Sequence, residues 1–225
     1  MAIVIILVMF FIVGIVLLNL KPAENDEQAR KSFLKDLAEV MESKLVPLAA
    51  YDDSYSISFT YKDLQFVYED IVSDVGQKRL HRSFLRLQTP SQLSLSFNER
   101  ANESEFNKDI VGGLLKTAEK ARPEQSKLDL PKLFEQFNVI TDDINATNTF
   151  LNDRKVLRII KEFKNTDTRG WANMAIRLKD GEIILSFSTQ PGHNPSLSQL
   201  RNDPHILEDY AKRLFVLAQI LNSPL

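Results

Sequence analysis

The longest run of hydrophobic residues in this chain lies near the N-terminus. Residues 2–20 carry no charge, and 17 of these 19 side chains are apolar. A helix of this length rises ~28 Å at ~1.5 Å per residue, close to the ~30 Å hydrocarbon core of a bilayer. We therefore expect a transmembrane anchor at residues 1–21 that contacts the bilayer through residues 2–20.

A cleaved signal peptide and a buried core helix are the alternatives for this run. A signal peptide typically has a basic stretch before a shorter apolar run and small residues at its cleavage site. No Lys or Arg precedes the run here, and residues 20–23 make a poor cleavage site. A core helix usually keeps a polar face, which this segment does not have.

The juxtamembrane segment, residues 22–50, follows a different pattern. Apolar residues recur every three to four positions over residues 23–46, which predicts an amphipathic helix that ends before Pro47. The expected apolar stripe consists of Ala29, Phe33, Leu34, Leu37, Ala38, Val40, Met41 and Leu45. The pattern leaves open whether this helix is a stalk or packs on the domain.

Strict alternation of apolar and polar residues begins at residue 54. Residues 54–61 and 64–70 predict a hairpin whose turn is Lys62-Asp63. Residues 80–88 and 92–97 predict two more strands, so we expect four adjacent antiparallel strands with one face exposed to water.

The second half of the chain mixes helical and strand patterns. Residues 106–118 have helical spacing and precede a polar loop. A strand is expected over 134–141, then a helix over 144–163 that Asn152-Asp153 interrupts.

A second hairpin and a final helix complete the pattern. Strands over 172–178 and 182–188 are joined by Asp180-Gly181, a strong hairpin turn. The last helix is expected to begin with Asp203 as its cap and Pro204 in its first turn. The strand residues that we expect to be mostly buried are Tyr55, Ile57, Phe59, Leu93, Leu95, Phe97, Ile183, Leu185 and Phe187.

These patterns predict one α+β domain over residues 51–225 with mainly antiparallel strands and packing helices. Outside the anchor about 40% of residues are hydrophobic, which is ordinary for a globular domain and argues against intrinsic disorder. No second apolar run has the length of a membrane span. A net charge of −2 and a pI of about 6.0 do not support a strongly basic nucleic-acid binder, so no specific nucleic acid is expected as a partner.

Charge near the anchor predicts its orientation. Lys21, Arg30, Lys31 and Lys35 follow the apolar run, and no Lys or Arg precedes it. Positive residues tend to stay on the cytoplasmic side, so we expect a cytoplasmic domain. The lack of cysteine fits a reducing compartment.

The candidate chemistry is sparse. The chain has no Cys and three His, with no spacing typical of a metal site or of a nucleophile beside its base, so no catalytic residue, metal or cofactor is expected. The acid pairs Asp52-Asp53, Glu69-Asp70 and Asp142-Asp143 are interpreted as solvated turn and cap residues; oxygen ligation of a hard cation is the alternative. The basic residues Lys78, Arg79, Arg82 and Arg86 are interpreted as a solvated strand face balanced by Glu69, Asp70 and Asp74; a face for anionic lipid or nucleic acid is the alternative.

The loop over residues 189–203, and not a strand face, is the expected binding surface. It is longer than the typical connection of ~4–6 residues, and long loops are often functional. The residues expected to make polar contacts are Gln190, His193, Asn194 and Ser196, with Ser198 nearby. A passive linker to the last helix is the alternative.

Residues 134–221 resemble part of the uncharacterised bacterial membrane-anchored proteins that carry a domain of unknown function. The resemblance rests on the stretch from Phe137 to Asp143, the helix after it, the strand pair joined by Asp180-Gly181 and the closing helix. Residues 55–97 loosely fit the strands that precede this segment in such proteins. Those proteins often have two adjacent spans where this chain has one, and the resemblance implies a membrane-tethered domain without assigning a site residue.

We therefore expect a single-pass, membrane-anchored, non-enzymatic binding or scaffolding domain with a protein partner. The alternative is a membrane-tethered hydrolase or transferase. Its pocket would be lined by His193, Asp203 and His205, or by Asp142 and Asp143.

Overall fold

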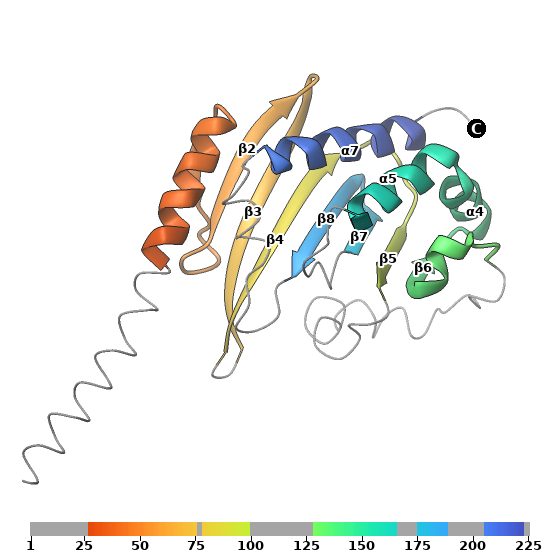
Figure 1. Ribbon diagram of the computed structural model, residues 1–225, viewed down its shortest axis with the longest axis horizontal. Coiled ribbons are helices and arrows are strands. Elements are labelled where there is room, and N and C mark those ends of the chain that lie inside the picture. Colours follow the sequence, from red (N-terminus) through yellow and green to blue (C-terminus); the bar gives the residue numbers. More distant parts are fainter. Residues whose placement is uncertain (1–26, 76–77, 100–127, 166–174, 189–204, 223–225) are drawn as a thin grey trace, which may run out of the picture.

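The computed structural model describes residues 27–75, 78–99, 128–165, 175–188 and 205–222. Its centre is an eight-stranded sheet in the order β1-β2-β3-β4-β8-β7-β5-β6, in which every neighbouring pair is antiparallel (Figure 1). The expected α+β class with antiparallel strands is thus confirmed.

The first four strands form a continuous antiparallel run. They are β1 (Leu45–Pro47), β2 (Tyr55–Tyr61), β3 (Leu64–Val75) and β4 (Lys78–Gln88). The predicted turn between β2 and β3 is confirmed, because Lys62 and Asp63 have φ angles of 47° and 65°. Two successive positive φ values are typical of the two-residue hairpin turn that matches the strand twist.

The other four strands are β5 (Leu95–Glu99), β6 (Phe137–Thr141), β7 (Ala175–Lys179) and β8 (Glu182–Ser188). The expected adjacency of the fourth predicted strand was wrong: β8 pairs with β4, and β5 lies between β7 and β6. Alternation specifies which face of a sheet a residue occupies, but it does not specify which strand lies beside it.

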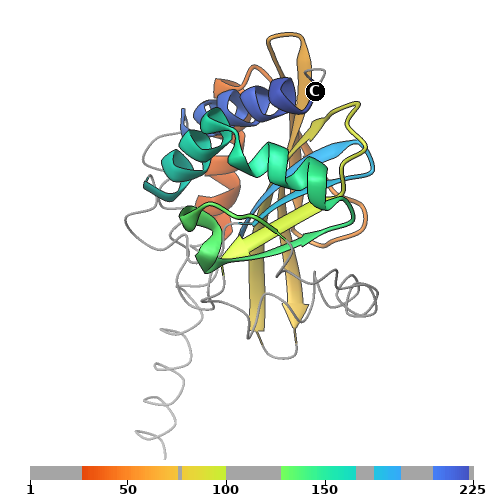
Figure 2. The same cartoon turned by 90° about the vertical axis from the view of Figure 1, so that its right-hand side faces the viewer.

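The helices that the structure describes lie on one face of this sheet (Figures 1 and 2). They are a helix over residues 27–40, the 3-10 helix η4 (Lys132–Gln136), α4 (Ile144–Asn152), α5 (Arg154–Asn165) and α7 (Ile206–Leu221). The predicted interruption at Asn152-Asp153 is confirmed. The N-cap position of α7 is taken by His205 rather than by the expected Asp203, which lies outside the described residues.

Helix 27–40 packs on the sheet and is not a free stalk. It is shorter than predicted, because Glu42 adopts a φ of 51° and the Ser43 N–H donates to the Ala38 carbonyl, a left-handed C-cap. Leu45, expected in the helix, instead starts β1. The stripe prediction was also wrong at Ala29 and Val40, which are exposed.

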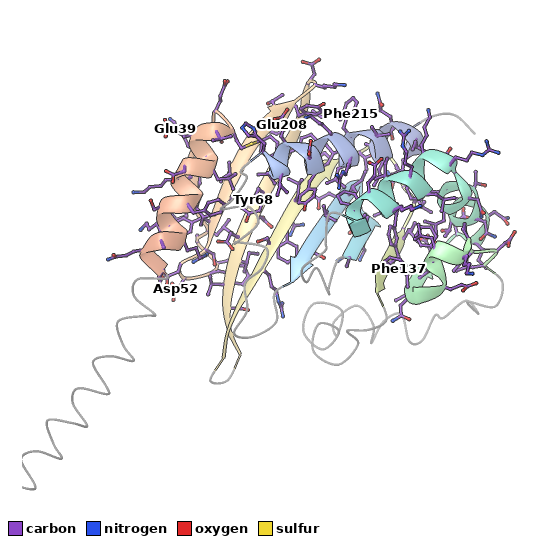
Figure 3. All side chains as sticks on the ribbon, viewed as in Figure 1. Glu39, Asp52, Tyr68, Phe137, Glu208 and Phe215 are labelled. Carbon is purple, nitrogen blue, oxygen red and sulfur yellow. The ribbon has the colours of Figure 1, made fainter. Side chains whose placement is uncertain are left out.

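The core fills the space between the sheet and the helices. Six of the nine expected core residues are buried: Ile57, Phe59, Leu95, Phe97, Ile183 and Leu185. Tyr55 and Leu93 are half-buried, and the side chain of Phe187 lies outside the described part. In Figure 3, Tyr68 and Phe137 lie in this core and Glu39 extends outward from helix 27–40.

The expected anchor, residues 2–20, lies outside the described residues, as do residues 106–118. Within the ranges that the structure describes, no helix has both the length and the apolar character that crossing a membrane requires.

Candidate functional site

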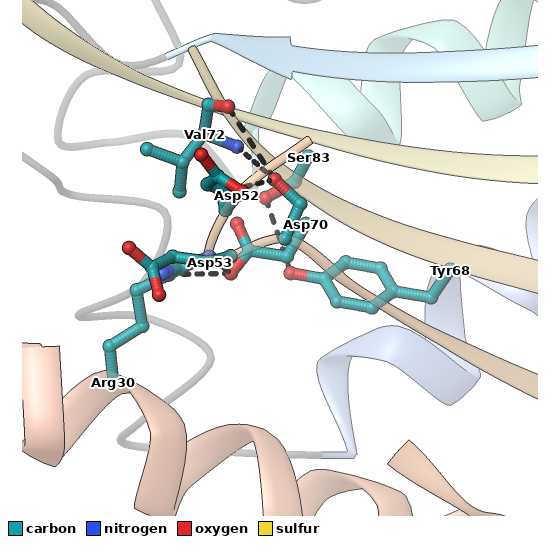
Figure 4. Close-up of polar contacts among 8 residues, drawn as sticks. Arg30, Asp52, Asp53, Tyr68, Asp70, Val72 and Ser83 are labelled. Atoms are coloured by element: carbon teal, nitrogen blue, oxygen red, sulfur yellow. Dashed lines mark hydrogen bonds and ion pairs between the residues drawn. The ribbon is translucent and has the colours of Figure 1, made fainter. Parts of the chain in front are cut away.

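A buried ion pair joins helix 27–40 to the middle of the sheet. Nε of Arg30 donates a 2.7 Å hydrogen bond to Oδ2 of Asp70 in β3, and the two side chains are 4% and 1% exposed (Figure 4). Nη2 of Arg30 also donates to the Asp53 carbonyl at 2.8 Å. The other oxygen of Asp70, Oδ1, is buried and accepts no hydrogen bond from the residues that the structure describes.

The polar side chains of Tyr68 and Ser83 lie beside this pair (Figure 4). The hydroxyls of Tyr68 and Ser83 share a hydrogen bond of 3.2 Å. The Val72 N–H donates to Oγ of Ser54 at 2.8 Å. Together with Arg30 and Asp70 these residues form what we call the Arg30 cluster.

Strand geometry explains why these groups face inward. Successive side chains of a strand point to opposite faces, so Tyr68, Asp70 and Val72 share the core-facing side of β3. On the helix, Arg30 lies three and four positions before the buried Phe33 and Leu34, and therefore on the same side.

Burial controls the electrostatics of the cluster. Burial raises the pKa of Asp70, and the Arg30 guanidinium opposes that shift. Burial, and then the nearby Asp70, raise the pKa of Tyr68 well above its usual range, so its hydroxyl stays protonated at neutral pH. Asp70 and Tyr68 are buried, and the hydrogen bonds of Arg30 to Asp70 and to the Asp53 carbonyl join helix 27–40 to the sheet.

The interpretation of Glu69-Asp70 as solvated acids was wrong for Asp70. Asp70 does not balance the basic residues of β4, because it points into the core while Glu69 points to the opposite face. The signal was present in the alternation of Phe66, Tyr68, Asp70 and Val72, where an acid occupies a core position.

We call the face of the sheet opposite the described helices the outer face (Figure 2). Arg82, Phe84 and Arg86 of β4 share this face. Nε of Arg86 donates to Glu69 at 2.8 Å, and its Nη1 lies 3.4 Å from Glu182. Arg86 is therefore balanced by two carboxylates.

Strand pairing aligns a row of side chains across the outer face. Each member of this row is the register partner of the next, from β3 through β4, β8, β7 and β5 to β6. The members, all half-buried, are Val67, Arg86, Ile184, Arg177, Ser96 and Ile140. This row combines apolar surface with two guanidinium groups.

Arg177 differs from Arg86 in its surroundings. Among the residues that the structure describes, no carboxylate lies within ion-pair distance of Arg177. Burial lowers the pKa of Arg177, Asp180 and Glu182 oppose that shift from farther away, and the charge of Arg86 adds to it. The sequence predicted the hairpin of β7 and β8, but it gave no signal that β8 also pairs with β4. That pairing places Arg86 and Arg177 on one row.

The residues expected to bind a partner, Gln190, His193, Asn194 and Ser196, lie outside the described residues. So do the side chains of Lys78, Arg79 and His81.

Of the residues proposed for an enzyme pocket, His193 and Asp203 lie outside the described residues. Asp143 caps α4 by accepting from the Ala146 N–H at 2.9 Å, as expected for a cap residue. The side chain of His205 is exposed and lies 3.7 Å from Glu208. Within the described residues, no group of three His, Cys, Asp or Glu side chains has the geometry to hold a metal ion.

No protein-family model, no curated protein and no solved structure matches this chain. The resemblance to membrane-anchored proteins with a domain of unknown function therefore remains an expectation from the residues quoted above.

Proposed function

We propose that this chain is a single-pass membrane protein whose α+β domain binds a protein partner, without catalysis, through the outer face of its sheet. The domain lies in the cytoplasm in this proposal, and the bilayer is contacted by residues 2–20.

The anchor part of the proposal rests on the uncharged apolar run and on the element that follows it. The described part of helix 27–40 begins six residues after Lys21. The Arg30 cluster joins this helix to the sheet. A span at residues 2–20 would thus be joined to the domain by a short segment, and the domain would stay close to the bilayer surface.

The binding part rests on one observation, the separation of the two sheet faces. The described helices cover one face, while the outer face carries half-buried apolar and charged side chains together. Surfaces that mix apolar residues with arginine are typical of protein interfaces.

Membrane fractionation tests the anchor. The full chain is expected to stay with membranes after a carbonate wash, and Val13→Arg should release a large part of it, because a charge at the centre of a span costs ~2.5–3.5 kcal/mol. Glu24→Arg, outside the apolar run, is the control. A wild-type chain found in the carbonate supernatant would refute the anchor.

Orientation has its own test. Protease added to intact cells should leave the domain uncut if it faces the cytoplasm, whereas lysed cells should show complete digestion. Digestion in intact cells would reverse the orientation.

Site-directed crosslinking tests the binding face. The chain has no cysteine, so Ser96→Cys on the outer face and Arg158→Cys on α5 each provide a single attachment point for a photocrosslinker. Adducts with another protein are expected from position 96 and not from position 158, whose side chain is 70% exposed on the helical side. Adducts from position 158 alone, or from neither, would contradict the proposal.

A further inference from the structure

We infer that the partner presents an acidic residue flanked by apolar side chains to the outer face, with its carboxylate paired with Arg177. This inference rests on the proposed binding function and names the chemistry of the partner.

The geometry of the row selects Arg177 over Arg86. The two residues are both cross-strand neighbours of Ile184, so they lie two strands, or about 10 Å, apart. Glu69 and Glu182 already contact Arg86. Arg177, with no described carboxylate in contact, has guanidinium donors for a partner's acid.

The residues beside Arg177 define the rest of the contact. Ile184 lies on one side of it, and Ser96 and then Ile140 lie on the other. All three are half-buried, so each retains some accessible surface. A guanidinium pairs with a carboxylate through two parallel hydrogen bonds, and the apolar neighbours strengthen that pair by excluding water.

Charge favours a protein carboxylate over a lipid phosphate as the occupant. Anionic membranes are typically recognised by clusters of about 4–8 Lys and Arg residues. On the row itself only Arg86 and Arg177 are basic, and two acids contact Arg86. Arg177, which has Ile184 beside it and no carboxylate of the described residues in contact, matches one acidic side chain better than a charged surface.

The test uses the full chain in neutral phosphatidylcholine nanodiscs, with Ser96→Cys carrying an environment-sensitive dye. The probe is a short peptide in which Glu alternates with Leu, and the comparison peptide replaces Glu by Gln. Arg177→Gln is expected to raise the half-saturating concentration of the Glu peptide about tenfold, as for loss of one hydrogen-bonded charge pair. The Gln peptide should bind the unchanged Arg177 chain about tenfold more weakly than the Glu peptide.

Three further variants test whether the charge at position 177 determines peptide binding. Arg177→Lys keeps the charge and should retain part of the affinity, whereas Arg177→Glu should prefer a peptide in which Lys alternates with Leu. Arg158→Gln, on the helical side, should leave binding of the Glu peptide unchanged. A preference of Arg177→Glu for the Lys peptide would not follow from a merely destabilised domain.

Two results would overturn the inference. One is equal affinity of the Glu peptide for the Arg177→Gln and unchanged chains. The other is a dye response to phosphatidylserine vesicles that depends on Arg177, with no response to the Glu peptide, which would identify a lipid surface instead. If crosslinks form at position 96 while Arg177 has no effect, the inference fails and the proposed function stands; if no crosslinks form there, the proposed function itself fails.

Discussion

Nε of Arg30 lies 2.7 Å from Oδ2 of Asp70, a buried contact between residues 40 positions apart. The contact joins helix 27–40, the first described element, to the core-facing side of β3. A buried ion pair adds little net stability, because removing both charges from water costs several kcal/mol. Its consequence is positional: the helix lies on the sheet where Arg30 meets the opposite charge of Asp70.

Replacing one partner of this pair should lower the stability of the domain more than replacing both partners. Arg30→Met leaves the Asp70 carboxylate buried alone and should lower the free energy of unfolding by ~3–5 kcal/mol, whereas Arg30→Met with Asp70→Leu should lie within ~1 kcal/mol of wild type or be more stable. Urea unfolding of a chain that begins at Ala23 measures both. Arg158→Met removes an exposed i,i+4 pair with Glu162 and should change the value by less than ~1 kcal/mol. Equal losses in the single and double variants would contradict this account.

The pH dependence of stability shows whether burial or the Arg30 charge has the larger effect on the pKa of Asp70. Burial raises the pKa of Asp70 in the folded state above the unfolded value of ~3.9. A raised folded pKa contributes stability that is present below pH ~3.9 and is lost as pH rises through the folded pKa. The unfolding free energy of wild type relative to Asp70→Asn should therefore fall as pH rises from about 3.5. A difference that grows with pH would mean that Arg30 outweighs burial.

Phe59 is expected to be a major core contact. It is 5% exposed, and its ring stacks on Phe66 with centroids 5.5 Å apart. Phe59→Ala should cost ~3–5 kcal/mol in urea unfolding, as for other large-to-small core changes. The same cost is predicted at Phe187, whose side chain lies outside the described residues. Ser58→Ala, one position away on the outer face, should change stability by less than ~0.5 kcal/mol.

Gly181 should not tolerate a side chain. Its φ is 77°, and an added Cβ would lie 3.0 Å from the Thr89 carbonyl oxygen. Gly181→Ala should lower the melting temperature and reduce the free energy of unfolding by at least ~1–2 kcal/mol, because a residue with a Cβ is strained in the left-handed conformation. Asp180→Gly in the same turn should be nearly neutral, because it relieves a φ of 52° but adds backbone entropy to the unfolded chain. A larger loss from Asp180→Gly would indicate that its side chain stabilises the turn.

The loop over residues 189–203 remains a predicted contact site. Replacing it with a shorter Gly/Ser segment should leave the melting temperature unchanged and reduce partner crosslinking if Gln190, His193, Asn194 or Ser196 contacts the partner. Unchanged crosslinking would identify the loop as a linker.

The sequence by itself determined the features that depend on neighbouring residues. Alternation placed Ile57 and Phe59 on the buried face, and two short turns, Lys62-Asp63 and Asp180-Gly181, predicted both hairpins correctly. Such patterns suffice because the two-residue period of a strand and the geometry of a tight turn involve only adjacent positions.

Only the tertiary structure decided which distant elements meet. β5 lies between β7 and β6, which the order of the chain did not indicate. The pairing of β4 with β8 brings Arg86 and Arg177 onto one row. The same folding brings Arg30 to Asp70, which adjacent sequence had suggested was a solvated acid. Alternation assigns a residue to a face, whereas the neighbour across a strand, and the burial of a charge, depend on how the whole sheet and its helices pack.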